Sequence, residues 1–162
     1  MIINFRRKTF NRTASIAIVA TSLLSLGAVA ASPEIAAAIK SRKANYKEIG
    51  GAFKTINDEV KTGAPVIDTI QPLAQEILKR GSMQMDFFPA GSGIDSGEKT
   101  RAKSTIWSGN ADFRKQHNDF IAAAEQLNKA IASGDNKAIA AAQKTLGGTC
   151  KSCHDQYREA DD

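Results

Sequence analysis

The chain has 162 residues, of which 42% are hydrophobic, 24% are charged and 6% are aromatic. This composition is typical of a globular protein and excludes disordered and fibrous chains. Its two cysteines are too few for a disulfide-rich scaffold. The formal net charge of +5 raises the question of a nucleic-acid or membrane partner, and the answer depends on where the basic residues lie.

The N-terminal residues have the pattern of a secretory signal peptide. Four basic residues lie in the first twelve positions, an apolar run follows at 14–26, and residues 28–30 read Ala-Val-Ala. We expect residues 1–30 to be removed on export to the periplasm; an uncleaved anchor is the alternative, although the run is short for a membrane-spanning helix. Residues 31–162 then form one domain with 18 basic and 17 acidic residues, so its charge gives no reason to expect nucleic-acid or membrane binding.

The first part of this domain predicts two helices. Ser32-Pro33-Glu34 is a helix start, with a capping hydroxyl, a proline and an acidic residue. From residue 35 to 60, apolar residues recur at alternating spacings of four and three, and Arg42 is the only charged member of that face. A second helix carries apolar residues from 66 to 77, and Pro72 within it predicts a kink or a later start.

The second part predicts a long loop and two more helices. Residues 87–103 read as loop, and a third helix starts at Ser104 with the same spacing up to residue 131. Ser133-Gly134-Asp135 ends it and caps a fourth helix over 136–158. No segment alternates long enough to predict a strand. Short connections make neighbouring helices antiparallel, so we expect an all-α, up-down four-helix bundle.

One motif carries distinctive chemistry, Cys150-Lys151-Ser152-Cys153-His154. Two thiols three positions apart can add to the two vinyl groups of a haem, and the adjacent histidine can then bind the iron. A thioredoxin-like dithiol needs a βαβ setting, which is missing. A zinc site needs four ligands, for which only these three side chains and His117 are available. A chance occurrence is the remaining alternative, so covalent haem attachment is favoured.

The motif continues as His154-Asp155-Gln156-Tyr157-Arg158 near the C-terminus. On the last predicted helix of an exported four-helix bundle, this motif resembles that of the cytochrome c′ family. Residues 42–47, 88–92, 102–107 and 133–135 resemble further motifs of that family. The resemblance implies one haem c per chain, attached through Cys150 and Cys153, with His154 as the axial iron ligand. Gly147 and Gly148 would let the macrocycle approach the helix closely.

The resemblance also implies roles for residues around the haem. An arginine on an apolar face needs an anion, and the family places a haem propionate at the position of Arg42. Lys43 occupies the place of a polar haem contact, Arg101 or Thr100 is expected near the propionates, and Arg158 is expected near the proximal histidine. Phe88, Phe113 and Phe120 are expected to line the haem crevice or to fill the core.

Tyr46 is expected to cover the distal side of the haem. Low-spin relatives offer a methionine there, whereas neutral phenol is a poor ligand for ferrous iron. The methionines that remain after export, Met83 and Met85, lie off that face. We therefore expect five-coordinate, high-spin iron. His117 is the other residue to consider, either as a second ligand or as a hydrogen-bonded histidine, and we favour the latter.

We expect a periplasmic haem protein that binds nitric oxide and carbon monoxide and exchanges single electrons with redox partner proteins. The alternative is a six-coordinate, low-spin electron carrier of the same bundle class. No catalytic triad or paired carboxylates stand out, so we do not expect an enzyme. The family commonly forms homodimers through its first two helices, where Val66 and Ile67 are expected to be exposed.

Overall fold

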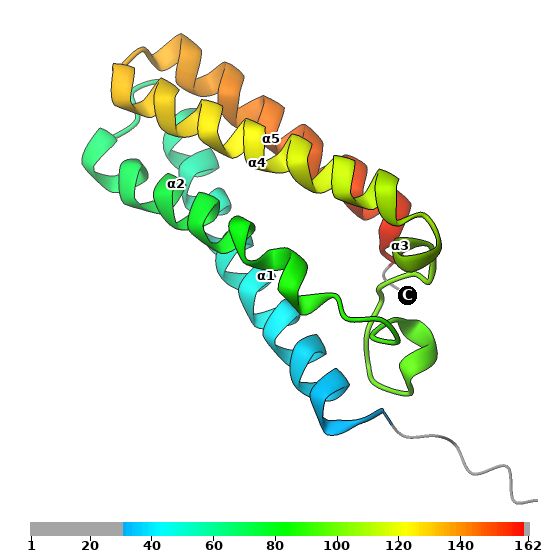
Figure 1. Ribbon diagram of the computed structural model, residues 1–162. Coiled ribbons are helices and arrows are strands. Elements are labelled where there is room, and N and C mark those ends of the chain that lie inside the picture. Colours follow the sequence, from blue (N-terminus) through cyan, green and yellow to red (C-terminus); the bar gives the residue numbers. More distant parts are fainter. Residues whose placement is uncertain (1–30, 161–162) are drawn as a thin grey trace, which may run out of the picture.

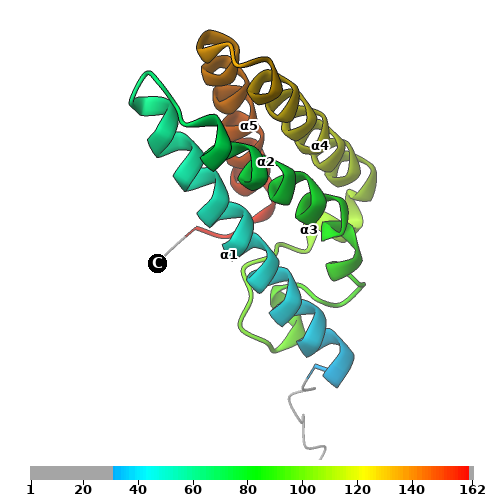
Figure 2. The same ribbon diagram turned by 90° about the vertical axis from the view of Figure 1, so that its left-hand side faces the viewer.

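The computed structural model describes residues 31–160, and the proposed signal peptide lies outside them. Four long helices run side by side, with successive helices antiparallel (Figures 1 and 2). They are α1 (Pro33–Lys61), α2 (Ile67–Ser82), α4 (Asn110–Ser133) and α5 (Asn136–Tyr157). The connection from α2 to α4 contains two 3-10 helices, η1 (Gln84–Phe87) and η2 (Ile94–Ser96), and the one-turn helix α3 (Thr105–Ser108). The predicted four-helix bundle is confirmed.

The predicted caps fix the helix ends. The Ser32 hydroxyl accepts a hydrogen bond from the Ile35 amide at 3.4 Å, with Pro33 at the first helical position. Gly134 ends α4 with a φ of 71°, in the left-handed region that glycine enters without strain. The Asp135 carboxylate then accepts from the Lys137 amide at 2.8 Å and begins α5.

One helix prediction was wrong, and for a second helix one of the two alternatives was wrong. The third helix breaks at Gly109, whose φ of −110° and ψ of 42° are not helical, so the segment is divided into α3 and α4. Helix α2 starts at Ile67 and passes through Pro72 rather than starting after it. Pro72 removes the amide that would bond to the carbonyl of Asp68, and both residues are exposed, where water can replace that bond.

The main core lies between the four long helices. Its fully buried members, each with 0% exposure, are Ile56 of α1, Ile70 of α2, Leu127 and Ile131 of α4, and Ile139 and Leu146 of α5. Ile67 packs against this core and is half-buried, so its predicted exposure was wrong, whereas Val66 is 55% exposed.

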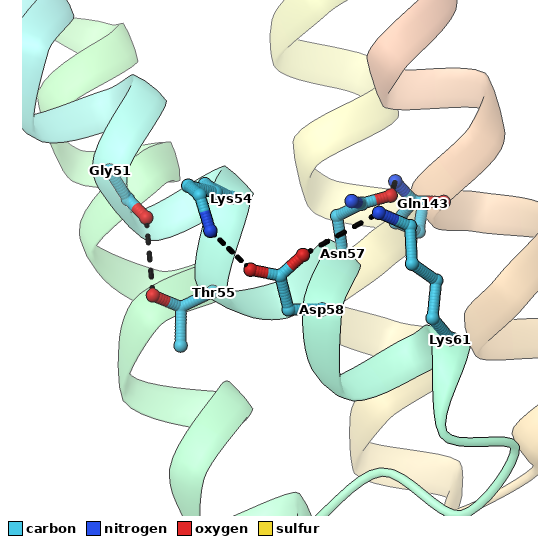
Figure 3. A network of polar contacts seen from close by, with 7 residues as sticks. All are labelled: Gly51, Lys54, Thr55, Asn57, Asp58, Lys61 and Gln143. Atoms are coloured by element: carbon cyan, nitrogen blue, oxygen red, sulfur yellow. Dashed lines mark hydrogen bonds and ion pairs between the residues drawn. The ribbon is translucent and has the colours of Figure 1, made fainter.

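Helices α1 and α5 are joined by a polar contact between their side chains (Figure 3). The Gln143 amide of α5 donates to Asn57 Oδ1 of α1 at 3.1 Å. Nearby, Asp58 forms ion pairs with Lys54 and Lys61, which are exposed and therefore contribute little to stability. One turn along α5 from Gln143, a Cβ on Gly147 would lie 3.1 Å from the Phe53 ring. Gly147 therefore allows close contact between α1 and α5.

The two helix pairs diverge toward the end that carries the long connection and the C-terminus (Figure 1). A second, smaller cluster lies there, with Ile106, Phe113 and Tyr157 buried. No helix within residues 31–160 is long and apolar enough to cross a membrane.

Candidate haem site

A cavity of about 850 Å³ lies at the end where the helix pairs diverge. Its volume is within the range of cofactor pockets. Its walls come from α1, α5, the long connection and the start of α4, so residues far apart in sequence share it. The lining residues are Arg42, Lys43, Tyr46, Lys47, Phe88, Lys99, Thr100, Arg101, Ala102, Ile106, Phe113, Cys153, His154, Tyr157, Arg158 and Ala160.

The end of α5 brings the attachment motif to this cavity. Cys153 and His154 line it, whereas Cys150 is half-buried one turn earlier and is not among the lining residues. The two cysteines form no disulfide with each other. Burial raises the pKa of the Cys150 thiol, and burial, with a smaller effect of Cys150, raises the pKa of the Cys153 thiol to about 11. Neither side chain is therefore a thiolate at neutral pH before it forms a thioether.

The long connection is fixed to the end of α5 by backbone hydrogen bonds. The Lys103 amide donates to the Tyr157 carbonyl at 3.0 Å, and the Glu159 amide donates to the Arg101 carbonyl at 2.9 Å. Ala102 and Arg158 form an isolated antiparallel bridge between these two bonds. This pairing places the wall formed by residues 99–102 beside residues 157–159 at the end of α5.

Arg42 reaches from α1 into the long connection. It is 3% exposed, and its Nη1 donates to Ser92 Oγ at 2.9 Å and to the Phe87 carbonyl at 3.2 Å. Its Nη2 donates to the Ser92 carbonyl at 2.7 Å and to Thr100 Oγ1 at 2.8 Å. These bonds use all four Nη hydrogens. Sequence reasoning found the charge on an apolar face and expected a haem propionate as its partner, but it missed these neutral acceptors of the loop.

Aromatic rings form the apolar wall of the cavity. The Phe88 and Phe113 rings meet edge to face at 4.9 Å between centroids, and Phe113 meets Tyr157 in the same way at 5.1 Å. The Arg42 guanidinium lies 4.6 Å from the Phe88 ring centroid, within cation–π range. Trp107 Nε1 donates to the Phe88 carbonyl at 3.1 Å and holds that segment in place.

Tyr46, which the family resemblance assigns to the distal side of the haem, lines the cavity from α1. The residue is 37% exposed in total. Burial of its phenol group raises the pKa of Tyr46, and Cys153 adds to the rise, while Arg42 opposes it. The side chain is therefore a neutral phenol at physiological pH, which is a poor iron ligand.

Basic side chains from three segments surround the cavity. Three basic residues singled out in the sequence, Lys43, Arg101 and Arg158, line it. Lys47 and Lys99 also line it and were missed by sequence reasoning. Lys47 lies one helical turn after Lys43, which was the available signal, but Lys99 is brought in by the fold of the loop. The Lys43 ammonium donates to the Lys99 carbonyl at 3.3 Å.

Several candidates lie away from the cavity. His117 Nε2 lies 3.0 Å from the Gly81 carbonyl; because a carbonyl only accepts, this nitrogen carries the proton. His117, Met83 and Met85 are not among the lining residues, but Met85 packs against the cluster of Ile106, Phe113 and Tyr157, which does line the cavity. Phe120 packs on the main core. Gly147 faces Phe53 rather than the cavity.

The residues present fit a haem. Cys153 and His154 offer a thioether link and an axial nitrogen, the aromatic rings offer an apolar surface, and the basic side chains offer partners for two carboxylates. A zinc site is not supported, because no group of three or more His, Cys, Asp or Glu side chains comes together within residues 31–160.

Comparison with known families decides between these possibilities. The family model of cytochrome c′ matches residues 37–158. The chain belongs to the cytochrome c′ family. Its cofactor is therefore haem c, which this family binds covalently, and the chain carries the cysteine pair that this attachment requires.

Individual relatives match over most of the chain. Cytochrome c′ of Pararhodospirillum photometricum is 34% identical over 130 residues, which cover 80% of this chain and all of the relative. The solved structure of cytochrome c′ from Shewanella frigidimarina matches with a TM-score of 0.73 and 28% identity, over 80% of this chain and 99% of that one. The nitric oxide complex of a variant from Alcaligenes xylosoxidans matches with a TM-score of 0.71 and 26% identity, over 78% and 97% of the two chains.

Proposed function

We propose that this cytochrome c′ family member is exported, carries five-coordinate, high-spin haem iron, binds nitric oxide and carbon monoxide, and exchanges single electrons. One observation carries the proposal. Among the described residues that line the cavity, His154 is the only histidine and there is no methionine. The side chain offered from α1 is Tyr46, whose raised pKa keeps it a neutral phenol.

Iron ligation follows from this donor set. His154 binds the iron on the proximal side, and Cys150 and Cys153 form the thioether links. The six-coordinate alternative needs a second strong ligand. His117 does not supply it, because its Nε2 is bonded to Gly81 and it does not line the cavity.

The surroundings of the open position favour neutral diatomic ligands. Nitric oxide and carbon monoxide bind ferrous haem without a hydrogen-bond donor, and an apolar, crowded face admits them. Dioxygen gains more from polar stabilisation, so we do not expect stable binding of dioxygen. The solved nitric oxide complex of the Alcaligenes xylosoxidans relative supports this choice of ligand.

The basic side chains at the cavity would interact with the haem propionates. Lys43, Arg101 and Arg158 line the cavity and would be partners of the two carboxylates. Arg42 has all four Nη hydrogens bonded to Phe87, Ser92 and Thr100, so it mainly holds the loop in place.

Export and assembly are part of the proposal. The signal-peptide pattern of residues 1–30 supports a periplasmic location. Val66, at the start of α2, is the exposed apolar residue that supports a homodimer through α1 and α2. Mass spectrometry of the mature N-terminus and light scattering of the purified protein test these two points.

Titration of the ferrous protein with gases tests the function. We expect one nitric oxide or carbon monoxide molecule to bind per haem, with saturable spectral changes, and no stable dioxygen complex. A ferrous protein that binds neither gas is a closed, six-coordinate electron carrier, and the gas-binding proposal would then be rejected.

A further inference from the structure

A buried polar cluster adjoins Tyr46 outside the cavity wall. It consists of Asn45 of α1, Arg80 of α2 and Gln84 of η1. Asn45 is 5% exposed and Gln84 is 1% exposed. Neither lines the cavity. Buried amides cost free energy unless they are hydrogen-bonded, so the direction in which each amide points is informative.

Arg80 fixes the orientation of both amides. A guanidinium can only donate, and Arg80 Nη1 donates to Asn45 Oδ1 at 3.2 Å. Asn45 Nδ2 then donates to the Arg80 carbonyl at 3.0 Å and to Gln84 Oε1. Rotating either amide by 180° would place two donors against each other. The Gln84 NH₂ group must therefore point away from Asn45.

The NH₂ group of Gln84 is a buried donor that needs an acceptor. Gln84 Nε2 has no hydrogen-bond partner in the described structure, and a buried donor left without an acceptor is unfavourable. Tyr46 is the titratable residue that this side chain affects. Gln84 stabilises the phenolate form and so lowers the pKa of Tyr46, although burial raises that pKa by more. The phenol oxygen of Tyr46 is therefore the acceptor that we assign to this donor.

We propose that Gln84 is a positioning residue, whose Nε2 donates a hydrogen bond to the Tyr46 phenol oxygen and holds the ring over the distal side of the cavity. Gln84 acts through Tyr46, because only Tyr46 lines the cavity. The proposal rests on the proposed function in one respect, that Tyr46 limits access of gas to the iron.

Carbon monoxide association with the ferrous holoprotein tests this role. Gln84→Met keeps the volume of the side chain and removes the donor, and we expect it to raise the association rate about fivefold, the effect of one ordinary hydrogen bond. In a Tyr46→Phe background, which lacks the phenol oxygen, the same substitution should change the rate less than about twofold. Gln71→Met is the control, because the Gln71 amide bonds to Asn128 and does not line the cavity.

Equal acceleration in both backgrounds, or no acceleration in either, would overturn the proposal, since Gln84 would then act by packing or not at all.

A second measurement does not depend on gas binding. The chain has two tyrosines, so Tyr157→Phe leaves Tyr46 alone, and ultraviolet resonance Raman bands then report whether its oxygen accepts a hydrogen bond.

We expect Gln84→Met to shift these bands toward a phenol that accepts none; unchanged bands contradict the proposal even in a protein that binds no gas. If Gln84→Met does not accumulate as holoprotein, Gln84→Glu retains the acceptor for Asn45, lacks the NH₂ donor, and should shift the same bands. Failure of the proposed function is seen separately, as a wild-type ferrous protein that takes up no carbon monoxide.

Discussion

The guanidinium of Arg42 donates hydrogen bonds to two groups of Ser92, the hydroxyl at 2.9 Å and the backbone carbonyl at 2.7 Å. The two residues are 50 positions apart and both are buried, at 3% and 0% exposure. Through this pair, α1 fixes the loop that forms one wall of the cavity.

Removing the guanidinium should therefore destabilise the whole fold. Arg42→Met leaves the buried acceptors of Ser92 and Thr100 without a donor, and we expect the free energy of unfolding to fall by about 3 kcal/mol. Ser92→Ala removes one acceptor and should cost only about 1 kcal/mol. Urea unfolding of the holoproteins measures both. Arg42→Lys with wild-type stability would contradict this account, because one ammonium cannot bond to all four acceptors.

The cysteine pair should determine how the haem is retained. Cys150→Ala with Cys153→Ala should yield protein from which acidified organic solvent extracts all of the haem, because no thioether is formed. Each single variant should keep its haem through one thioether. Mass spectrometry of the denatured chains detects the bound haem directly, and a double variant that retains covalent haem is incompatible with this assignment.

Tyr46 should limit the access of gases to the iron. Tyr46→Ala removes the ring from the distal side. We expect carbon monoxide to bind about tenfold faster and more tightly, because the conformation with an uncovered iron changes from the minor to the main one. Stopped-flow mixing with the ferrous protein measures the rate. Gln71→Met, which changes a residue outside the cavity, should leave it unaltered. An unaltered rate in Tyr46→Ala would show that the ring does not cover the iron.

The raised pKa of Tyr46 predicts how stability depends on alkaline pH. Tyrosines in the unfolded chain ionise near pH 10, whereas Tyr46 in the folded protein stays protonated at that pH. The unfolded state therefore binds fewer protons above pH 10, and the free energy of unfolding falls as the pH rises. Tyr46→Phe should make this decline shallower between pH 10 and 12. Equal slopes in urea unfolding would count against the burial of this phenol.

Much of the fold could be predicted from local signals. The caps at Ser32 and Asp135 and the apolar spacing of four and three each specify structure within a few residues, and they gave the four long helices. The path of α2 through Pro72 and the break at Gly109 could not be predicted, because the effect of each residue on its helix depends on the surroundings. Pro72 is tolerated where its helix faces solvent, and Gly109 allows the chain to change direction between α3 and α4.

The attachment motif and Tyr46 could likewise be found in the sequence, because each stands in a recognisable local pattern. The partners of Arg42 could not, since Ser92 and Thr100 reach it only through the path of a long loop. Gln84 gave no signal at all, because its significance depends on two amide orientations set by Arg80 on another helix.

The coordination state of the iron is the central claim, and the absorption spectrum of the purified holoprotein at neutral pH, in its ferric and ferrous forms, tests it most directly. We predict the broad bands of five-coordinate, high-spin haem in both oxidation states. Sharp low-spin bands after reduction would show that a second strong ligand binds the iron and would contradict the account.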